Sequence, residues 1–250
     1  MGPLEALAIL IAGLGAGTIN AVVGSGTLLT FPTLLAFGFP PVTANVSNTI
    51  GLVPGSVAGA WGYRRELAGQ RRRALRLGLA SLLGGAAGGV LLLVLPEHAF
   101  ETIVPVLIAL GVLLVIFGPR ISAWVAKRHG DGGGEHWWVW PAVLATGVYG
   151  GYFGAAQGVL LMAALGIGVA DTLQRLNATK NVLAAIVNGV AGLIFTLVAD
   201  VDWRVVALIA IGSVMGGLLG AFVGRRLPPQ VLRGVIVVVG VVALVALLAK

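Results

Sequence analysis

Long apolar runs separated by short polar breaks make up most of this chain. The runs fall at about 4–23, 27–38, 43–62, 76–95, 101–118, 138–156, 157–170, 180–198, 204–223 and 230–249. A helix needs roughly 20 apolar residues to cross a bilayer. The pattern therefore predicts an all-α polytopic membrane protein with about eight to ten crossings.

Two of the runs, 27–38 and 157–170, are shorter than the others. The hydrocarbon core of a bilayer is roughly 30 Å thick, so neither run can cross it as an ordinary helix. They either form parts of broken helices near the midplane or re-enter as hairpins. The composition leaves no room for a sizeable soluble domain, since 58% of the residues are hydrophobic and only 10% are charged, against roughly 25% charged in soluble domains.

Positive charge is concentrated in a few of the polar breaks. The loop "YRRELAGQRRRALR" carries six arginines, and such loops stay in the cytoplasm. The acidic loops "PEHAFE" and "ADVDWR" then lie outside. The net charge of +7 follows from this topology, so nucleic acid is not an expected partner. The segment 119–137, with the glycine-rich "RHGDGGGEHWW", is expected to be a cytoplasmic linker between an N-terminal membrane repeat, 1–118, and a C-terminal one, 138–250.

The two repeats match at a spacing of about 132 residues. Gly26 pairs with Gly158, Asn45 with Asn177, and "VAG" recurs with one extra residue of spacing. The arginine loop of the first repeat aligns with the aspartate loop of the second, so we expect two inverted repeats of about five helical segments each. Both termini would then lie outside. Parallel repeats would place one charged loop on the wrong side, and re-entrant hairpins would change the count of crossings.

Polar clusters follow the two short runs, as "TANVSNTIG" at 43–51 and "LNATKNVLA" at 176–184. In inverted-repeat transporters, short or interrupted segments at matching positions indicate the substrate site. Two helix starts that meet near the midplane would bind an anion through their free N–H groups. The candidate substrate-binding residues are Ser25, Asn45, Ser47, Asn48, Gln157, Asn177, Thr179, Lys180 and Asn181.

Two alternatives apply to these residues. The amides and hydroxyls are of the types that cap helix starts, and Lys180 could snorkel to the cytoplasmic interface. Asn20, Asn188 and Tyr152 could line the same cavity.

The apolar runs lack the residues that catalysis requires. No Asp or Glu falls in the middle of a run, the three histidines lie in loops, and the chain has no cysteine. We therefore expect no catalytic centre, metal site or cofactor, and no enzyme activity. The phosphate-binding motif of ATP-driven pumps is missing as well.

The sequence resembles the sulfite exporter TauE/SafE family, part of the 4-toluene sulfonate uptake permease superfamily. The likeness covers nearly the whole chain and is most specific in "GSGTLLTFPTLL" with "ANVSNTIG", and in "GAAQGVLLMAAL" with "NATKNVLAAIVN". It implies a small-anion permease of the inner (plasma) membrane of a bacterium or archaeon, for sulfite, sulfoacetate or another organosulfonate. It points to the polar positions given above.

These observations predict a secondary transporter that works by alternating access between lipid-embedded repeats. A cytoplasm-negative potential contributes about 2.3 kcal/mol per charge per 100 mV to the outward movement of an anion, which favours export. Proton-coupled uptake is less favoured because the runs carry no Asp, Glu or His in their middle. An anion channel and a coupled uptake permease for another small anion stay open. The glycine-rich faces make a homodimer plausible.

Overall fold

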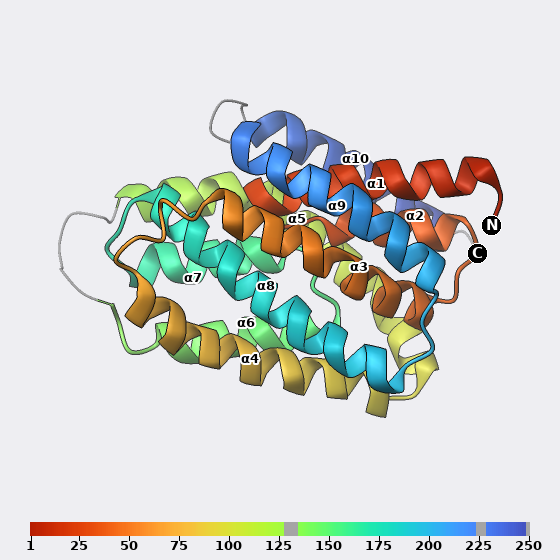
Figure 1. The fold of residues 1–250 in the computed structure, drawn as a ribbon, viewed down its shortest axis with the longest axis horizontal. Coiled ribbons are helices and arrows are strands. Elements are labelled where there is room, and N and C mark those ends of the chain that lie inside the picture. Colours follow the sequence, from red (N-terminus) through yellow and green to blue (C-terminus); the bar gives the residue numbers. More distant parts are fainter. Residues whose placement is uncertain (128–134, 224–228, 249–250) are drawn as a thin grey trace.

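The computed structural model describes residues 1–127, 135–223 and 229–248, and these ranges contain only helices and their connections (Figure 1). The prediction of an all-α fold is confirmed. The helices are α1 (Pro3–Val22), α2 (Thr27–Ala36), α3 (Pro41–Gly62), α4 (Arg71–Val94), α5 (Glu97–Lys127), α6 (Val139–Tyr152), α7 (Gln157–Gly168), α8 (Leu173–Val198), α9 (Trp203–Val223) and α10 (Pro229–Leu248).

Five helices of the described ranges are long and apolar enough to cross a membrane by length and composition: α1, α4, the Glu97–Gly118 part of α5, α8 and α9. The fold is therefore that of a multi-pass membrane protein. α3 has 22 residues but does not qualify, because the polar residues of its first turns lower its mean hydropathy. The two short runs form α2 and α7, as their lengths predict.

Two interruptions of helical structure separate α1 from α2 and α6 from α7. The first interruption, residues 23–26, contains Gly24 at φ +85°, and the second, residues 153–156, contains Gly154 at φ +77° and Ala156 at φ +60°. These left-handed conformations end a helix and favour glycine. We call the two segments the first break and the second break.

Helix pairs in this fold come in matched sets. α1 packs against α9 and α4 against α6, α3 packs against α9 and α8 against α4, and α2 packs against α10 and α7 against α5. If each helix of α1–α5 is replaced by the corresponding helix of α6–α10, and the reverse, each contact pair becomes the pair given with it. α3 and α8 pack against each other in the middle of the bundle and run in opposite directions (Figure 1). The two halves of the chain therefore make corresponding contacts, and that they are inverted repeats stays a prediction.

One hydrogen bond joins equivalent positions of the two repeats. Asn188 of α8 donates from Nδ2 to Ser56 Oγ of α3 at 3.1 Å, and the two residues are 132 positions apart, the spacing of the sequence repeat.

Glycines make the closest helix seams. Gly84 and Gly88 of α4 face the backbone of α6 at Leu144 and Val148, where a side chain would overlap main-chain atoms. α1 and α9 meet in the same manner. Small residues allow helices to approach this closely in lipid, so the glycine patterns in these seams serve helix packing.

The charged loops lie at opposite ends of the bundle (Figure 1). The connection between α3 and α4, with its arginines, is at one end, and the connection between α8 and α9, with Asp200 and Asp202, is at the other. Of the expected linker 119–137, the first residues continue α5 to Lys127, and 128–134 lie outside the described residues.

Candidate functional site

The two breaks meet inside the bundle. The backbone N–H of Gly158, at the start of α7, donates to the carbonyl oxygen of Gly24 at 2.9 Å. A Cβ atom on either glycine would overlap the backbone of the other. The helices α2 and α7 therefore begin next to each other. We call the place where Gly24 contacts Gly158 the crossing.

Aromatic rings hold the second break in position. Phe153 packs edge-to-face against Phe31 of α2, with ring centroids 5.1 Å apart, and Phe100 of α5 packs against both Phe153 and Tyr152. All three phenylalanines are almost fully buried. Aromatic pairs of this geometry are worth about 0.5–1.5 kcal/mol beyond their buried area, and they link α2, α5 and the second break.

Three predicted site residues of α8 contact the end of α1. Asn177 and Asn181 donate from Nδ2 to the carbonyl oxygen of Ala21, at 3.3 and 3.2 Å. The Lys180 amine donates to the carbonyl oxygens of Asn20 at 3.1 Å and Ala21 at 3.4 Å. A helix leaves its last carbonyls without internal partners, and the interruption of α1 exposes these two to α8.

α3 makes the equivalent contact with the end of α6. Asn45 donates from Nδ2 to the carbonyl oxygen of Tyr152 at 2.9 Å. Asn48 faces α2 instead: its Oδ1 accepts from Thr30 Oγ1, and its Nδ2 lies 3.5 Å from Thr27 Oγ1. The asparagines of each repeat thus bind the interrupted helices at the crossing.

The two alternative interpretations of these residues are wrong. α3 begins at Pro41 and α8 at Leu173, with Thr172 as the N-cap that accepts from the Arg175 N–H. The asparagines lie beyond these starts and do not cap their own helices. Lys180 does not snorkel either, since its side chain is 0% exposed.

Several buried polar atoms at the crossing have no hydrogen-bond partner. They are Ser25 Oγ, Gln157 Nε2, Asn45 Oδ1, Asn177 Oδ1 and the Tyr152 hydroxyl. A buried polar group without a partner costs about 1–3 kcal/mol, so a ligand or water that bound there would recover this free energy. Ser25 and Gln157 flank the Gly24–Gly158 contact in sequence and supply a hydroxyl and an amide donor.

Ser47 and Thr179 lie away from the crossing, at opposite ends of the bundle. Ser47 Oγ accepts from the N–H of Asp202 at 3.0 Å, and Thr179 Oγ1 donates to Gln70 Oε1 at 2.9 Å. Each therefore fixes a loop that belongs to the other half of the chain.

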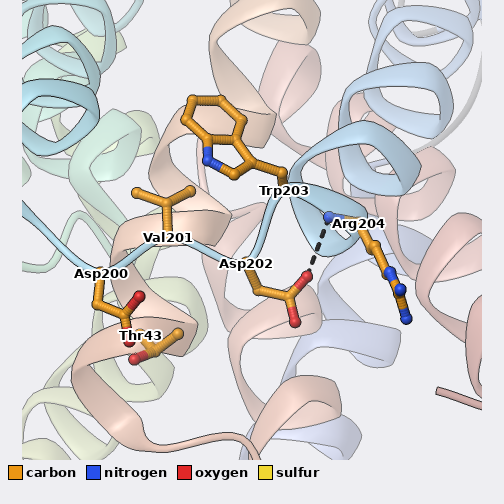
Figure 2. Close-up of a pocket in the computed structure, with 6 residues that line it drawn as sticks. All are labelled: Thr43, Asp200, Val201, Asp202, Trp203 and Arg204. Carbon is orange, nitrogen blue, oxygen red and sulfur yellow. Dashed lines mark hydrogen bonds between the residues drawn. The ribbon is translucent and has the colours of Figure 1, made fainter.

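The loop that Ser47 fixes borders a surface depression of about 390 Å³ (Figure 2). Asp202 Oδ1 accepts from the N–H groups of Arg204 and Val205 and so caps the start of α9. The lining residues are Thr43, Asp200, Val201, Asp202, Trp203 and Arg204.

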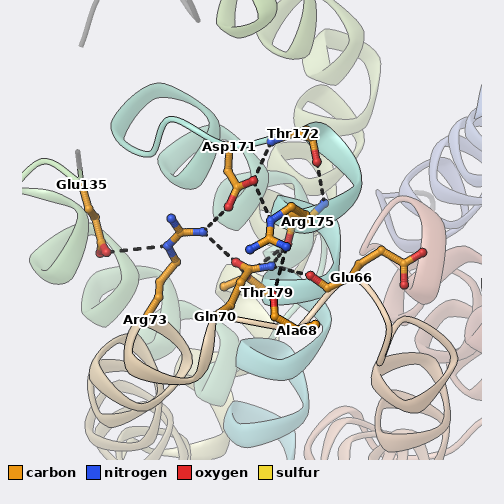
Figure 3. Close-up of polar contacts among 9 residues, drawn as sticks. All are labelled: Glu66, Ala68, Gln70, Arg73, Glu135, Asp171, Thr172, Arg175 and Thr179. Atoms are coloured by element: carbon orange, nitrogen blue, oxygen red, sulfur yellow. Dashed lines mark hydrogen bonds and ion pairs between the residues drawn. The ribbon is translucent and has the colours of Figure 1, made fainter. Parts of the chain in front are cut away.

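An ion-pair network occupies the other end (Figure 3). Asp171 accepts from Arg73 at 2.6 Å and from Arg175 at 2.8 Å, while Glu135 pairs with Arg73 and Arg76. The network joins the start of α4 to the start of α8 and so ties the two repeats together.

Acidification is expected to weaken this network at Asp171. Burial alone would raise the pKa of its carboxyl, but hydrogen bonds from Arg73, Arg175 and the Thr172 N–H hold that pKa below its ordinary value. The carboxylate therefore stabilises the fold fully above about pH 4, which is the pKa of an aspartate in the unfolded chain. This contribution disappears as the pH falls through the lower pKa of the folded state.

Asp171→Asn should lower the free energy of unfolding by about 2 kcal/mol at neutral pH and make the stability less sensitive to acid. Thermal unfolding in detergent over a pH series measures both effects. The exposed Asp200→Asn is the control, and identical curves for Asp171→Asn and the native protein would contradict the assignment.

Sequence reasoning missed Ser56, Thr30 and Gln70. Ser56 accepts from Asn20 Nδ2 at 3.3 Å as well as from Asn188. It follows Asn45 by about three helical turns and so lies on the same face of α3, a periodicity that could have revealed it. No such signal exists for Gln70, which lies in a loop.

The long apolar helices, the two breaks and the buried polar groups at their crossing define a polytopic membrane protein with a polar site in its interior. The chain belongs to the sulfite exporter TauE/SafE family, whose family model matches residues 9–247. It is a membrane transporter of this family.

Its curated relatives carry transporter names. A "Probable membrane transporter protein" of Haemophilus influenzae is 26% identical over 87% of this chain and 85% of its own length. "Probable membrane transporter protein YfcA" of Escherichia coli is 25% identical over 91% of this chain and 83% of its own. "Probable membrane transporter protein ORF9" of a Sinorhizobium species is 25% identical over 96% and 91%. No solved structure matches the chain.

Proposed function

We propose that this transporter carries a small sulfur-containing anion, such as sulfite or an organosulfonate like sulfoacetate, by alternating access. The observation that carries the proposal is the crossing, where two helix N-termini and a fully buried lysine lie close to unpartnered polar groups. The N-terminal ends of helices carry partial positive charge and attract anions, and the unpartnered side-chain groups would supply the contacts.

The charges of the described interior also favour an anion. Lys180 is buried in α8, and none of the described Asp or Glu side chains lies within ion-pair distance of it. An anion at the crossing would pair with the ammonium form of this side chain. A cation would meet the partial positive charges of the two helix N-termini, which opposes binding.

Two features support alternating access. The two repeats make corresponding helix contacts and meet at the crossing. Polar contacts also join the repeats at both ends of the bundle, at Ser47 and at Asp171. For an anion that moves alone, a cytoplasm-negative potential favours export by about 2.3 kcal/mol per charge per 100 mV. We therefore assign outward transport to the protein.

Flux into liposomes tests the substrate class. The purified protein would be reconstituted and supplied with sulfite, sulfoacetate, taurine, sulfate or thiosulfate. We expect saturable flux of at least one sulfur anion, with counterflow when the liposomes are preloaded. Unsaturable flux without counterflow would indicate an anion channel instead. Transport of cations or neutral solutes alone would overturn the anion assignment.

A pair of serine variants tests the position of the site. Ser25 and Ser81 are both fully buried, and both hydroxyls lack a partner, but Ser25 lies in the first break and Ser81 in α4. A hydrogen bond to a charged group contributes about 1.5–3 kcal/mol, so Ser25→Ala should weaken anion binding about tenfold or more. Ser81→Ala should retain native flux. Equal flux in the two variants would remove Ser25 from the site.

A further inference from the structure

Lys180 is a buried amine surrounded by uncharged partners. Its side chain is 0% exposed, and its amine donates to two backbone carbonyls, those of Asn20 and Ala21. These carbonyls end α1, and the first break begins two residues after Ala21. The amine is therefore beside the crossing and belongs to the lining of the proposed site.

The two acceptors match the neutral form of the amine. A neutral amine has two N–H groups and a lone pair, whereas the ammonium form has three N–H groups and a full charge. A buried ammonium without a counter-ion is strongly disfavoured. The two carbonyls can accept from both N–H groups of the neutral form, which leaves its lone pair available.

Other ionisable groups on the neighbouring elements do not replace Lys180. α8 packs against α1, α3, α4, α6 and α7. Neither α7 nor the span of α3 carries a charged residue, and the only one in α1 is Glu5, in its first turn. Asp171 and Glu135 are engaged with arginines. The remaining ionisable groups within these elements are Arg71, Arg72, Arg73, Arg76, Tyr149, Tyr152 and Arg175, and those in the connections beside them include Tyr63, Arg64, Arg65, Glu66, His136, Asp200 and Asp202.

We propose that Lys180 couples anion binding to the binding of one proton, an inference that rests on the proposed function. When the anion enters the crossing, the lone pair of the Lys180 amine takes a proton from a buffer acid or hydronium ion, and a new N–H bond forms. The resulting ammonium neutralises one charge of the anion. On release of the anion, the proton returns to water and the neutral amine binds the two α1 carbonyls again.

This coupling changes the electrical balance of transport. Sulfoacetate carries two negative charges at neutral pH, so its complex with one proton still carries one and moves outward with the membrane potential. An anion with a single charge would move together with its proton as a neutral pair, which the potential does not drive. The proposal therefore favours a dianion for export.

Proton uptake on binding tests the proposal in the native protein. Sulfoacetate would be added to detergent-purified protein in weak buffer with a pH-indicator dye, and its affinity measured in parallel by calorimetry over a pH series. Sulfoacetate does not change its own charge near neutral pH. We expect one proton taken up per anion bound, and an affinity that falls about tenfold per pH unit where the free amine predominates.

The outcomes separate this inference from the proposed function. Binding of sulfoacetate with no proton uptake, at an affinity independent of pH, would overturn the role of Lys180 and leave the anion transporter standing. Failure of every sulfur anion to bind would overturn the proposed function and the coupling together.

Two variants assign the proton to a residue. Lys180→Met keeps the length of the side chain without the amine, and should abolish proton uptake and weaken binding of sulfoacetate at least tenfold. Ser81→Ala removes a buried, unpartnered hydroxyl in α4, outside the crossing, and should retain one proton per anion. Persistent uptake in Lys180→Met, or its loss in Ser81→Ala, would overturn the assignment. If Lys180→Met does not fold, the native titration still decides the proposal.

Discussion

Gly24→Ala is expected to abolish transport and to prevent accumulation of a stably folded protein. The Cβ of alanine would overlap the α carbon of Gly158 and lie 2.9 Å from its carbonyl carbon. The residue would also have to adopt φ +85°. The left-handed conformation costs about 1–2 kcal/mol, and forcing an atom into a packed site costs about 1–3 kcal/mol more. The two costs add to about 2–5 kcal/mol, and the upper end of this sum reaches the lower end of the total stability of proteins, about 5–15 kcal/mol.

Gly38→Ala is the matched control for this change. Gly38 has φ +82°, almost the same conformation, but nothing lies within 4 Å of an added Cβ. It should lose only about 1–2 kcal/mol and keep its transport. Thermal unfolding in detergent and liposome flux measure the two variants side by side. If both variants behave alike, backbone conformation alone matters at Gly24 and the crossing is not essential.

Gly88→Ala should separate α4 from α6 and strongly reduce stability. An added Cβ would overlap the carbonyl oxygen of Val148 and lie 2.8 Å from the Tyr152 nitrogen. These are backbone atoms of α6, so no side chain can move aside, and the helices must shift apart. We expect a loss of about 2 kcal/mol or more, since overpacking costs about 1–3 kcal/mol in addition to the lost contacts of the seam.

Gly189→Ala, which also lies within a helix, is expected not to reduce stability. Gly189 lies in α8, and nothing lies within 4 Å of an added Cβ there. Alanine is favoured over glycine in helices by about 1 kcal/mol, so this variant should be as stable as the native protein or slightly more so. Thermal midpoints of both variants in detergent give the comparison. A stable Gly88→Ala protein would show that the seam tolerates separation.

The positions of the helices could be predicted because lipid imposes a length on each apolar run. Runs 27–38 and 157–170 were too short to cross, and they form α2 and α7. The polar residues at 43–51 and 176–184 could be assigned to the site region because they follow those runs at matching positions. The N-terminal extension of α4 to Arg71 could not, since charged residues can belong to a helix that extends beyond the lipid.

The direction of each polar side chain could not be predicted. Asn45 and Ser47 are two residues apart in α3, yet Asn45 binds the end of α6 and Ser47 binds the loop before α9. Neighbouring positions on a helix point about 100° apart, so the burial of each one depends on which helix lies beside it. The packing of α3 between α8 and α9 decides which partner each side chain meets. A short stretch of sequence does not predict that packing.

The glycine seams have a mechanical consequence. They join α1 to α9 and α4 to α6, and each seam therefore links a helix of one repeat to a helix of the other. Neither repeat can move as a rigid body without tearing two seams. For alternating access we therefore expect the moving units to be composite: α1, α3 and α9 in one, and α4, α6 and α8 in the other. The contact between Ser56 of α3 and Asn188 of α8 joins these two units.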